Sequence, residues 1–541
     1  MSSPRPKHRH YSRRGAALGG VLACAVSLTL ASCAGSDAAD EKTDASGRPI
    51  VQVLVAQNPD QMPVAEMGWT AQVEELCECA IEWESVDATG FGEQRAAMLA
   101  AQDVPDISIS AFSVEDTQRN PYFEDLGTHL DQMPNLREYF DTVPTARQTV
   151  ATTDDEVFSV SSYMGAGYEV PGRYMIVNKT WLEALDLEPP RTWDELHDML
   201  VAFKEQDPNG NGKADEIPLN INQLSIDSFG GFASPFLLLN SAGLTTHFAT
   251  GSMLQGIYVE DGEVRNALVS EEYREVIGFL HQLMSEGLIP EDALTADSSQ
   301  YSARNQADGI TPTVGMVFGW GASDLGTEFE DQYISIAPPK ADESMADDEV
   351  VWDASADTYV FTSNIAMSSS ATNKEAAYRV IDALFSEEIS VQQFRGTMPS
   401  FVTDDGDGTY TVTDHFWEAS NDREALEGGF AGWISPDITL ANEINIARLQ
   451  KMDANYQDVY QNIDWENDVI PPWARPSEED TNTIANNATN VLNYAMQMTA
   501  SWLQDGNVDE QWDEYVDQVN TLGGTQNVEL WQQIYDEARQ K

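Results

Sequence analysis

Short apolar strand-like runs alternate with helix-like segments near the start of this chain, and this alternation limits the possible folds more than any other feature. The runs Ile50–Val55, Ile81–Glu84 and Val104–Ile109 are separated by helical patterns that end near Leu76 and Ala101. Strands that alternate with helices are typical of a mainly parallel α/β sheet. With 541 residues, the chain has room for two or three domains of this kind.

Acidic residues dominate the charge of the chain. The formal net charge is −61 at pH 7, from 29 Lys and Arg against 90 Asp and Glu. A field of this sign repels nucleic acid and anionic membrane surfaces, and it keeps a protein soluble. We therefore expect no nucleic-acid partner.

Residues 1–32 have the pattern of a secretory signal peptide. A basic segment without acidic side chains precedes an uncharged apolar run from Gly15 to Ser32. The run ends Leu30-Ala31-Ser32-Cys33, which resembles a bacterial lipobox, a signal in which the cysteine becomes lipid-modified and N-terminal. The alternative is an ordinary signal peptide with an incidental Cys33. No later run reaches the roughly 18 apolar residues of a membrane span, so we expect a lipid-anchored protein on the extracytoplasmic face of the cell membrane.

Two cysteines remain once the signal and Cys33 are set aside. They form the sequence Cys77-Glu-Cys79, between a helical segment and a strand. A disulfide is allowed outside the cell, although a single intervening residue makes a small ring. Two free thiols are the alternative, and a metal site is disfavoured because no histidine is near. We predict the disulfide.

The run from Asp207 to Glu216 has the spacing of a calcium loop. Oxygen-bearing side chains stand at alternate positions, and Gly212 occupies the sixth position, where a sharp turn is needed. The twelfth position is Pro218, so the run is not a full EF-hand. The candidate ligands are Asp207, Asn209, Asn211, Lys213 through its carbonyl, Asp215 and Glu216. An ordinary Asn-Gly turn is the alternative, but a turn does not require oxygens at all these positions.

The segment before this loop predicts a capped helix. Thr192 and Glu195 form a capping box, and Trp193, Leu196, Leu200 and Phe203 recur at helical spacing. The helix should extend over roughly 14 residues. The loop would then join this helix to the strand that begins near Ile217, and an ion bound there would be structural rather than catalytic.

The order of motifs resembles the bacterial extracellular solute-binding proteins of family 1, the receptors of ABC importers. The calcium-like loop further resembles the long subgroup that includes alginate-oligosaccharide receptors. Besides the lipobox, the motifs are Met98-Leu-Ala-Ala-Gln-Asp-Val-Pro-Asp106, Asn178-Lys with Pro190-Arg-Thr-Trp-Asp-Glu-Leu196, Val314-Gly-Met-Val-Phe-Gly-Trp320, and Trp512-Asp-Glu-Tyr515 with Ile534-Tyr-Asp-Glu-Ala538.

This resemblance implies an α/β fold of two lobes, with a carbohydrate held in the cleft between them and a helical C-terminal region. It implies structural Ca²⁺ in the loop, and Trp320 and Ser323 in the cleft. It also implies a monomer that works with ABC permease subunits and their ATPase. We expect a tether at residues 33–48, a first lobe at 49–165 and 312–345, and a second lobe at 166–311 and 346–541.

Further ligand-binding candidates follow from the chemistry of sugars. Sugar rings stack on aromatic side chains, their hydroxyls need polar partners, and open α/β sheets bind ligands on the loops after their strands. The alternative for each aromatic residue is packing in a core. The candidates are Asn58, Phe112, Tyr163, Trp320, Ser323, Trp352 and Trp433.

An enzyme and a receptor for another kind of solute are the two alternatives to an oligosaccharide receptor. A secreted glycan-degrading enzyme is disfavoured because the chain has neither a His-Glu-x-x-His nor a Gly-x-Ser-x-Gly motif. A receptor for a peptide or another small solute is compatible with the same fold. The number of aromatic residues favours a glycan, so we predict a binding protein and not an enzyme.

The lipobox yields a testable expectation. The variant Cys33→Ser should leave the membrane and appear in the soluble fraction with its fold intact, because the lipid attachment point is lost. Fractionation followed by immunoblotting measures this directly. Equal solubility of the unmodified protein and the variant would rule out lipid anchoring.

Overall fold

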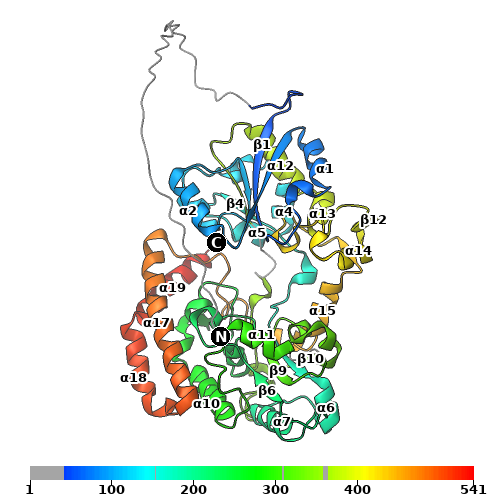
Figure 1. Ribbon diagram of the computed structural model, residues 1–541. Helices are drawn as coiled ribbons and strands as arrows, with labels where there is room; N and C mark the ends of the chain where they lie inside the picture. The colour runs from blue at the N-terminus through cyan, green and yellow to red at the C-terminus, as the bar shows by residue number, and fades with distance from the viewer. Residues whose placement is uncertain (1–41, 153, 307–309, 358–363, 541) are drawn as a thin grey trace, which may run out of the picture. The chain divides into compact units, whose positions relative to one another are not determined.

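Two β-sheets, each with its own hydrophobic core, organise the computed structural model, which describes residues 42–152, 154–306, 310–357 and 364–540 (Figure 1). The predicted signal peptide and Cys33 lie outside these ranges. Within them, no helix is long and apolar enough to cross a membrane. The predicted α/β class with a helical C-terminal region is confirmed.

The first sheet has five strands in the order β2-β1-β3-β11-β4. The predicted parallel arrangement is confirmed at its start, since β1 pairs in parallel with β2 and β3. Strand β11 comes from far along the chain and lies antiparallel between β3 and β4. The strands are β1 (Ile50–Gln57), β2 (Ala80–Asp87), β3 (Ile107–Ile109), β4 (Ser159–Ser161) and β11 (Asn364–Met367), and the accompanying helices include α1 (Thr70–Cys77), α2 (Gly92–Ala101), α4 (Pro134–Thr142), α12 (Lys374–Leu384) and α13 (Glu387–Arg395).

The second sheet has four strands in the order β10-β5-β9-β6. Only β6 and β9 pair in parallel. All six residues of β9 are buried, and a Cβ atom on its Gly315 would lie 2.4 Å from the Phe203 ring, so only glycine permits this close approach of helix and strand. The strands are β5 (Tyr174–Asn178), β6 (Ile217–Asn220), β9 (Val314–Gly319) and β10 (Tyr333–Ile336), and the accompanying helices include α6 (Lys179–Leu185), α7 (Trp193–Glu205), α10 (Glu271–Ser285) and α11 (Ser298–Gln306).

Helix α7 begins as its sequence predicts. The Thr192 hydroxyl accepts a hydrogen bond from the Glu195 amide at 3.2 Å. The Glu195 carboxylate accepts from the Arg191 amide at 2.7 Å, one residue earlier than a capping box requires. The predicted apolar face, which includes Trp193 and Phe203, is buried.

The C-terminal helices pack on one another and on α10 (Figure 1). They are α17 (Glu478–Asp505), α18 (Val508–Thr521) and α19 (Gly524–Ala538). Helix α19 also contacts the hairpin of β7 (Ile257–Glu260) and β8 (Glu263–Asn266), which turns at Asp261-Gly262. A separate small sheet contains β12 (Val402–Gly406), β13 (Thr409–Val412) and β14 (Thr439–Ala441).

The chain passes between the two hydrophobic cores three times. The first core contains buried residues of the ranges 51–170 and 365–449, and the second core contains residues of 174–352 and 452–519. The structure differs from the expected lobe boundaries at two places. Strands β9 and β10 join β5, so residues 312–345 belong with the second sheet, whereas β11 joins β3 and β4, so the part of 346–541 around β11 belongs with the first. In both places the lobe is decided by strand pairs between segments far apart in the sequence, such as Tyr174 with Gly319 and Ile109 with Ile365.

A buried ion pair in the first core holds the chain segments of two of these passages together. Arg395 bonds through Nε to Glu443, and both side chains are only 2% exposed. Nη2 of Arg395 donates to the Tyr168 hydroxyl. Tyr168 lies just before the first passage, and Glu443 caps α15 (Ile444–Asp453), the helix that forms the third passage. One guanidinium therefore holds both segments where they leave the first core.

A second polar cluster holds the same segments where they enter the second core. The Tyr174 hydroxyl donates to Asp453 at 3.3 Å, and the Met175 amide donates to the Tyr456 hydroxyl at 2.8 Å. Burial raises the pKa of Asp453, while hydrogen bonds from Tyr460 and Tyr174 oppose that shift. Beside them, Arg173 lies 3.5 Å from the buried carboxylate of Asp353. Each end of the passages is thus fixed by buried polar contacts.

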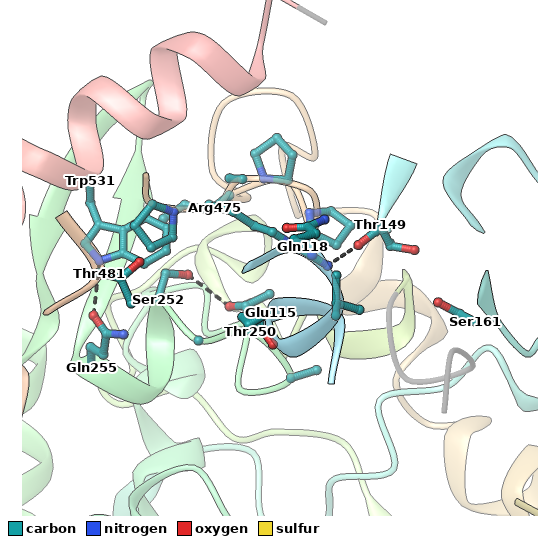
Figure 2. Close-up of a pocket in the computed structure, with 18 of the residues that line it drawn as sticks. Glu115, Gln118, Thr149, Ser161, Thr250, Ser252, Gln255, Arg475, Thr481 and Trp531 are labelled. Carbon is teal, nitrogen blue, oxygen red and sulfur yellow. Dashed lines mark hydrogen bonds between the residues drawn. The ribbon is translucent and has the colours of Figure 1, made fainter. Parts of the chain in front are cut away.

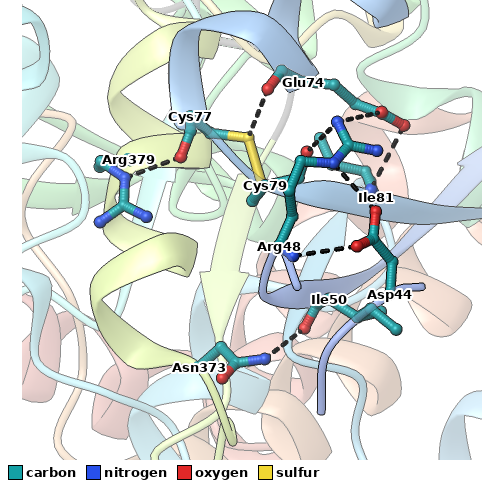
Figure 3. The surroundings of a disulfide bond; sticks show 9 residues. All are labelled: Asp44, Arg48, Ile50, Glu74, Cys77, Cys79, Ile81, Asn373 and Arg379. Carbon is teal, nitrogen blue, oxygen red and sulfur yellow. Dashed lines mark hydrogen bonds and ion pairs between the residues drawn. A yellow bond between two sulfur atoms is a disulfide. The ribbon is translucent and has the colours of Figure 1, made fainter. Parts of the chain in front are cut away.

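The structure contains the disulfide between Cys77 and Cys79 (Figure 3). It closes the tight connection from α1 to β2, in which Glu78 has a φ of 51°. Two arginines bind the flanking carbonyls: Arg379 Nε donates to Cys77 O at 2.7 Å, and Arg48 Nη1 donates to Cys79 O at 3.1 Å. Both cysteines are fully buried.

The variant Arg395→Met tests the importance of the buried ion pair. It would leave Glu443 buried without a countercharge, which costs about 3–5 kcal/mol in the free energy of unfolding. Denaturant titration measures this loss. Arg539→Met is the matched control, because its ion pair with Glu466 is exposed and should contribute below about 1 kcal/mol. Equal losses in the two variants would contradict the prediction.

Candidate functional site

A large cavity lies between the first sheet with its neighbouring helix and a set of segments from residues 249–255 and the C-terminal part of the chain (Figure 2). Its volume is about 650 Å³. One wall comes from α3 (Val114–Arg119), Thr149, Ser161 and Asn364, which belong to the first sheet and its surroundings. The opposite wall is formed by Ala249, Thr250, Gly251, Ser252, Gln255, Ile470, Pro471, Pro472, Ala474, Arg475, Pro476, Thr481 and Trp531.

Polar contacts order the walls of this cavity. Arg475 reaches across to donate through Nη2 to the Thr149 carbonyl, as Figure 2 shows. The Trp531 indole donates to Gln255 at 3.1 Å. Burial lowers the pKa of Arg475, and the nearby Glu115 carboxylate opposes that shift. The cavity combines hydroxyl, amide and charged groups with the edge of Trp531, whose side chain is 3% exposed and packs mainly in a small hydrophobic cluster. Polar groups of this kind are the lining that a ligand rich in hydroxyls requires.

Trp320 and Ser323 line a second cavity of about 190 Å³. Trp320 directly follows β9, and its amide donates to the Asp324 carboxylate at 2.8 Å. Burial raises the pKa of Asp324, and the hydrogen bonds from the Gly321 and Trp320 amides oppose the shift. Helix α15 supplies the facing wall, including Arg448, which pairs with Glu330 at 2.7 Å.

Asn58 lines a third cavity of about 280 Å³ at the carboxyl end of β1. Its side chain is exposed, and Gln57, Gln61 and Ser110 share the lining. Asn58 and Trp320 thus both follow a strand and line a cavity, as expected for ligand residues of an open α/β sheet. The two residues lie in separate cavities and on different sheets.

The other four predicted ligand residues are buried. Tyr163 and Trp433 form an isolated β-bridge, and Trp433 donates through its indole to the Phe385 carbonyl at 3.0 Å. Both belong to the first core, whereas Trp320 follows a strand of the second sheet. The expected assignment of Trp320 to the first lobe and Trp433 to the second is therefore reversed.

Trp352 and Phe112 are core residues in this structure. Trp352 is 0% exposed, donates to the Arg173 carbonyl at 2.8 Å and packs on Tyr456. Phe112 packs edge-on against Phe123. Their positions after strands or between glycine-rich segments do not distinguish a cleft residue from one that fills a core. Arg475 and Trp531 were missed because their cavity assembles from segments more than 350 residues apart.

The Asp207–Glu216 loop gathers its polar groups as its spacing predicts. The Asp207 carboxylate accepts from the Gly212 amide at 3.0 Å, and the Asn211 amide donates to both oxygens of Asp215. Oδ1 of Asp207 and Oε1 of Glu216 are buried without a hydrogen-bond partner among the described residues. Burial first, and then the Asp207 and Asp215 carboxylates, raise the pKa of Glu216.

The unpaired carboxylate oxygens fit a cation, whereas the amide groups of the loop's asparagines are turned toward a carboxylate. In the described ranges, no three His, Cys, Asp or Glu side chains have the arrangement of a metal site. Two of the five predicted side-chain ligands are asparagines, whose amide groups are turned toward Asp215. The two unpaired carboxylate oxygens are the groups that a cation would satisfy.

Comparison with known proteins gives a consistent result. A family model described as bacterial extracellular solute-binding protein matches residues 68–390. A solved structure of an HMO-binding, ABC-transporter-associated solute-binding protein from Bifidobacterium longum infantis is 38% identical, covers 92% of this chain and 100% of that chain, and has a TM-score of 0.86. Another, described as an extracellular solute-binding protein from Bifidobacterium longum subsp. infantis, is 36% identical with the same coverage and a TM-score of 0.87.

A more distant relative has a defined name. The fructooligosaccharide ABC transporter substrate-binding protein FusA of Streptococcus pneumoniae is 26% identical over 485 residues, which is 84% of each chain. The likeness to these proteins therefore extends over most of the chain and includes both sheets.

Proposed function

This chain belongs to the bacterial extracellular solute-binding proteins, and from that membership we propose that it captures an oligosaccharide and delivers it to an ABC permease. The observation that carries the proposal is the cavity of about 650 Å³, which the first sheet and α3 line on one side and residues 249–255 and C-terminal segments line on the other, with hydroxyl and amide side chains on both sides. The relatives named for HMO and fructooligosaccharide binding support a carbohydrate as the ligand.

Capture would use residues on both sides of the cavity. A ligand that contacts both walls favours the conformation in which the walls are close, because only contacts made in that conformation shift the equilibrium. The permease and its ATPase would then receive the loaded protein. We further propose a monomer, anchored by lipid at Cys33 on the extracytoplasmic face of the membrane. The lipobox supports the anchor.

The family and the relatives named above are binding proteins. We accordingly propose that the chain has no catalytic activity of its own. Its polar groups in the large cavity would orient hydroxyls by hydrogen bonding, and the indole of Trp531 would provide an apolar edge.

We also propose that the Asp207–Glu216 loop binds structural Ca²⁺. The unpaired oxygens of Asp207 and Glu216 support this, as does the absence of sulfur and imidazole donors in the loop. One structure of the relative FusA is described as an EF-hand mutant, so that protein contains such a motif. The ion would fix the connection between α7 and β6 and lies outside the proposed ligand cavities.

Calorimetric titration with pooled HMO, kestose and mixed peptides tests the proposed function. We expect saccharide binding without cleavage. We propose that the saccharide also stacks on Trp320 in the cavity of about 190 Å³, so Trp320→Ala should weaken binding by roughly thirtyfold, since loss of a stacked aromatic costs on the order of 2 kcal/mol. Trp352→Ala is the core control and should lose about 3–5 kcal/mol of stability. Binding of peptides alone, or release of shorter saccharides, would overturn the proposal.

Removal of calcium should lower the melting temperature of the unmodified protein, because an ion that binds only the folded state stabilises it. Asp207→Asn should show the lower melting temperature without any further effect of chelator. Asparagine is preferable to alanine here, since residue 207 has a φ of 46°. Asp404→Ala, in the acidic hairpin of β12 and β13, is the control. A melting curve that chelator leaves unmoved would contradict the calcium site.

A further inference from the structure

Phe232 is an exposed aromatic residue beside Trp320, and it is not among the ligand residues predicted from the sequence. Its side chain is 37% exposed, although large apolar side chains of the described chain are mostly buried. Its ring meets the Trp320 ring edge-on, with the centroids 5.3 Å apart and an angle of 85° between the planes. An exposed ring in this position extends the aromatic surface that Trp320 presents.

The backbone and a buried cation hold Phe232 in place. The Arg173 guanidinium lies 4.8 Å from the Phe232 ring centroid and donates to the Gly230 carbonyl at 3.2 Å. Arg173 is itself buried next to Asp353. The ring of Trp320 is also constrained, since it lies where a Cβ atom on Gly172 would be only 2.2 Å away. The two aromatic rings therefore form a fixed corner.

Leu254 continues the apolar surface toward the large cavity. It is 42% exposed, and a Cβ atom on Gly230 would lie 2.2 Å from its Cδ2, so the Gly230 backbone touches it. The next residue, Gln255, lines the large cavity. Contacts through Phe232, Gly230 and Leu254 thus connect Trp320, which lines one cavity, with the segment that lines the other.

We propose that Phe232 stacks against one unit of the bound saccharide and joins the two cavities into one binding track. The track begins at Ser323, passes Trp320, Phe232 and Leu254, and ends at Gln255. Its ligand class is a saccharide chain long enough to contact both ends, with an apolar ring face toward Phe232. This inference rests on the proposed function and adds a residue and a length requirement to it.

Variants at Phe232 test the stacking role against a packing role. With size-fractionated HMO as the probe, Phe232→Ala and Phe232→Leu should each lower the association constant by roughly tenfold or more, because neither retains a flat ring. Phe232→Tyr should restore most of it. Trp465→Ala is the matched control: Trp465 is 44% exposed and lines none of the three cavities described, so affinity should not change.

Chain length gives an independent measurement. Affinity should rise with the number of sugar units in the HMO fractions until the track is filled, and the Phe232→Ala defect should be larger for long fractions than for the shortest. Leucine and tyrosine variants that bind equally well would overturn the stacking role, and affinity independent of length would overturn the joined track. If the unmodified protein binds no fraction, the proposed function itself fails together with the track.

Discussion

The buried ion pair between Arg395 and Glu443 is the interaction on which the connection of the two cores depends. Each side chain is 2% exposed, so the loss of either partner would leave the other charge buried and unpaired. Because Arg395 also bonds Tyr168, a single guanidinium fixes the first and the third passage together. The acidic balance of the chain makes such a cation valuable, since the described part has many more carboxylates than bases to pair with them.

The cavities follow from the sheets that these passages join. Asn58 follows β1 and Trp320 follows β9, and ligands of open α/β sheets bind beyond such strand ends. The large cavity has another origin, because α3 meets a C-terminal segment that crosses to it through Arg475. Backbone position thus supplies two of the polar sites, and tertiary packing of distant segments supplies the third.

Local patterns predicted the local structure well. The α7 cap and the bond between Cys77 and Cys79 each depend on residues close in sequence, and each is present. The lobe boundaries could not be predicted in this way, because the sheet to which β9 or β11 belongs depends on pairing with strands far away in the sequence. Strand β9 is buried at every position, so its own sequence is compatible with either core.

The predicted site residues also differ in how far the sequence could place them. Trp320 and Ser323 line a cavity, as the resemblance to the family implied, while Trp352 fills the second core and donates to a backbone carbonyl. Trp320 directly follows β9, whereas Trp352 lies in the segment between β10 and β11, and only the surrounding chain decides which of them is buried. Phe232 was missed because a phenylalanine after two glycines carries no signal of exposure. Its neighbours Arg173 and Trp320 are 59 and 88 residues away.

Helix α15 also has a mechanical consequence. It begins at Glu443 in the first core and ends at Asp453 in the second, with its hydrogen bonds unbroken between two fixed ends. A hydrogen-bonded helix resists bending more strongly than an extended segment does, so any change of angle between the cores must be taken up elsewhere. Residues 169–172 join the same two cores without a helix, and Gly172 there has a φ of 62°. We therefore expect the cores to move by rotation about the axis of α15, which leaves the helix unbent, rather than by a motion that bends it.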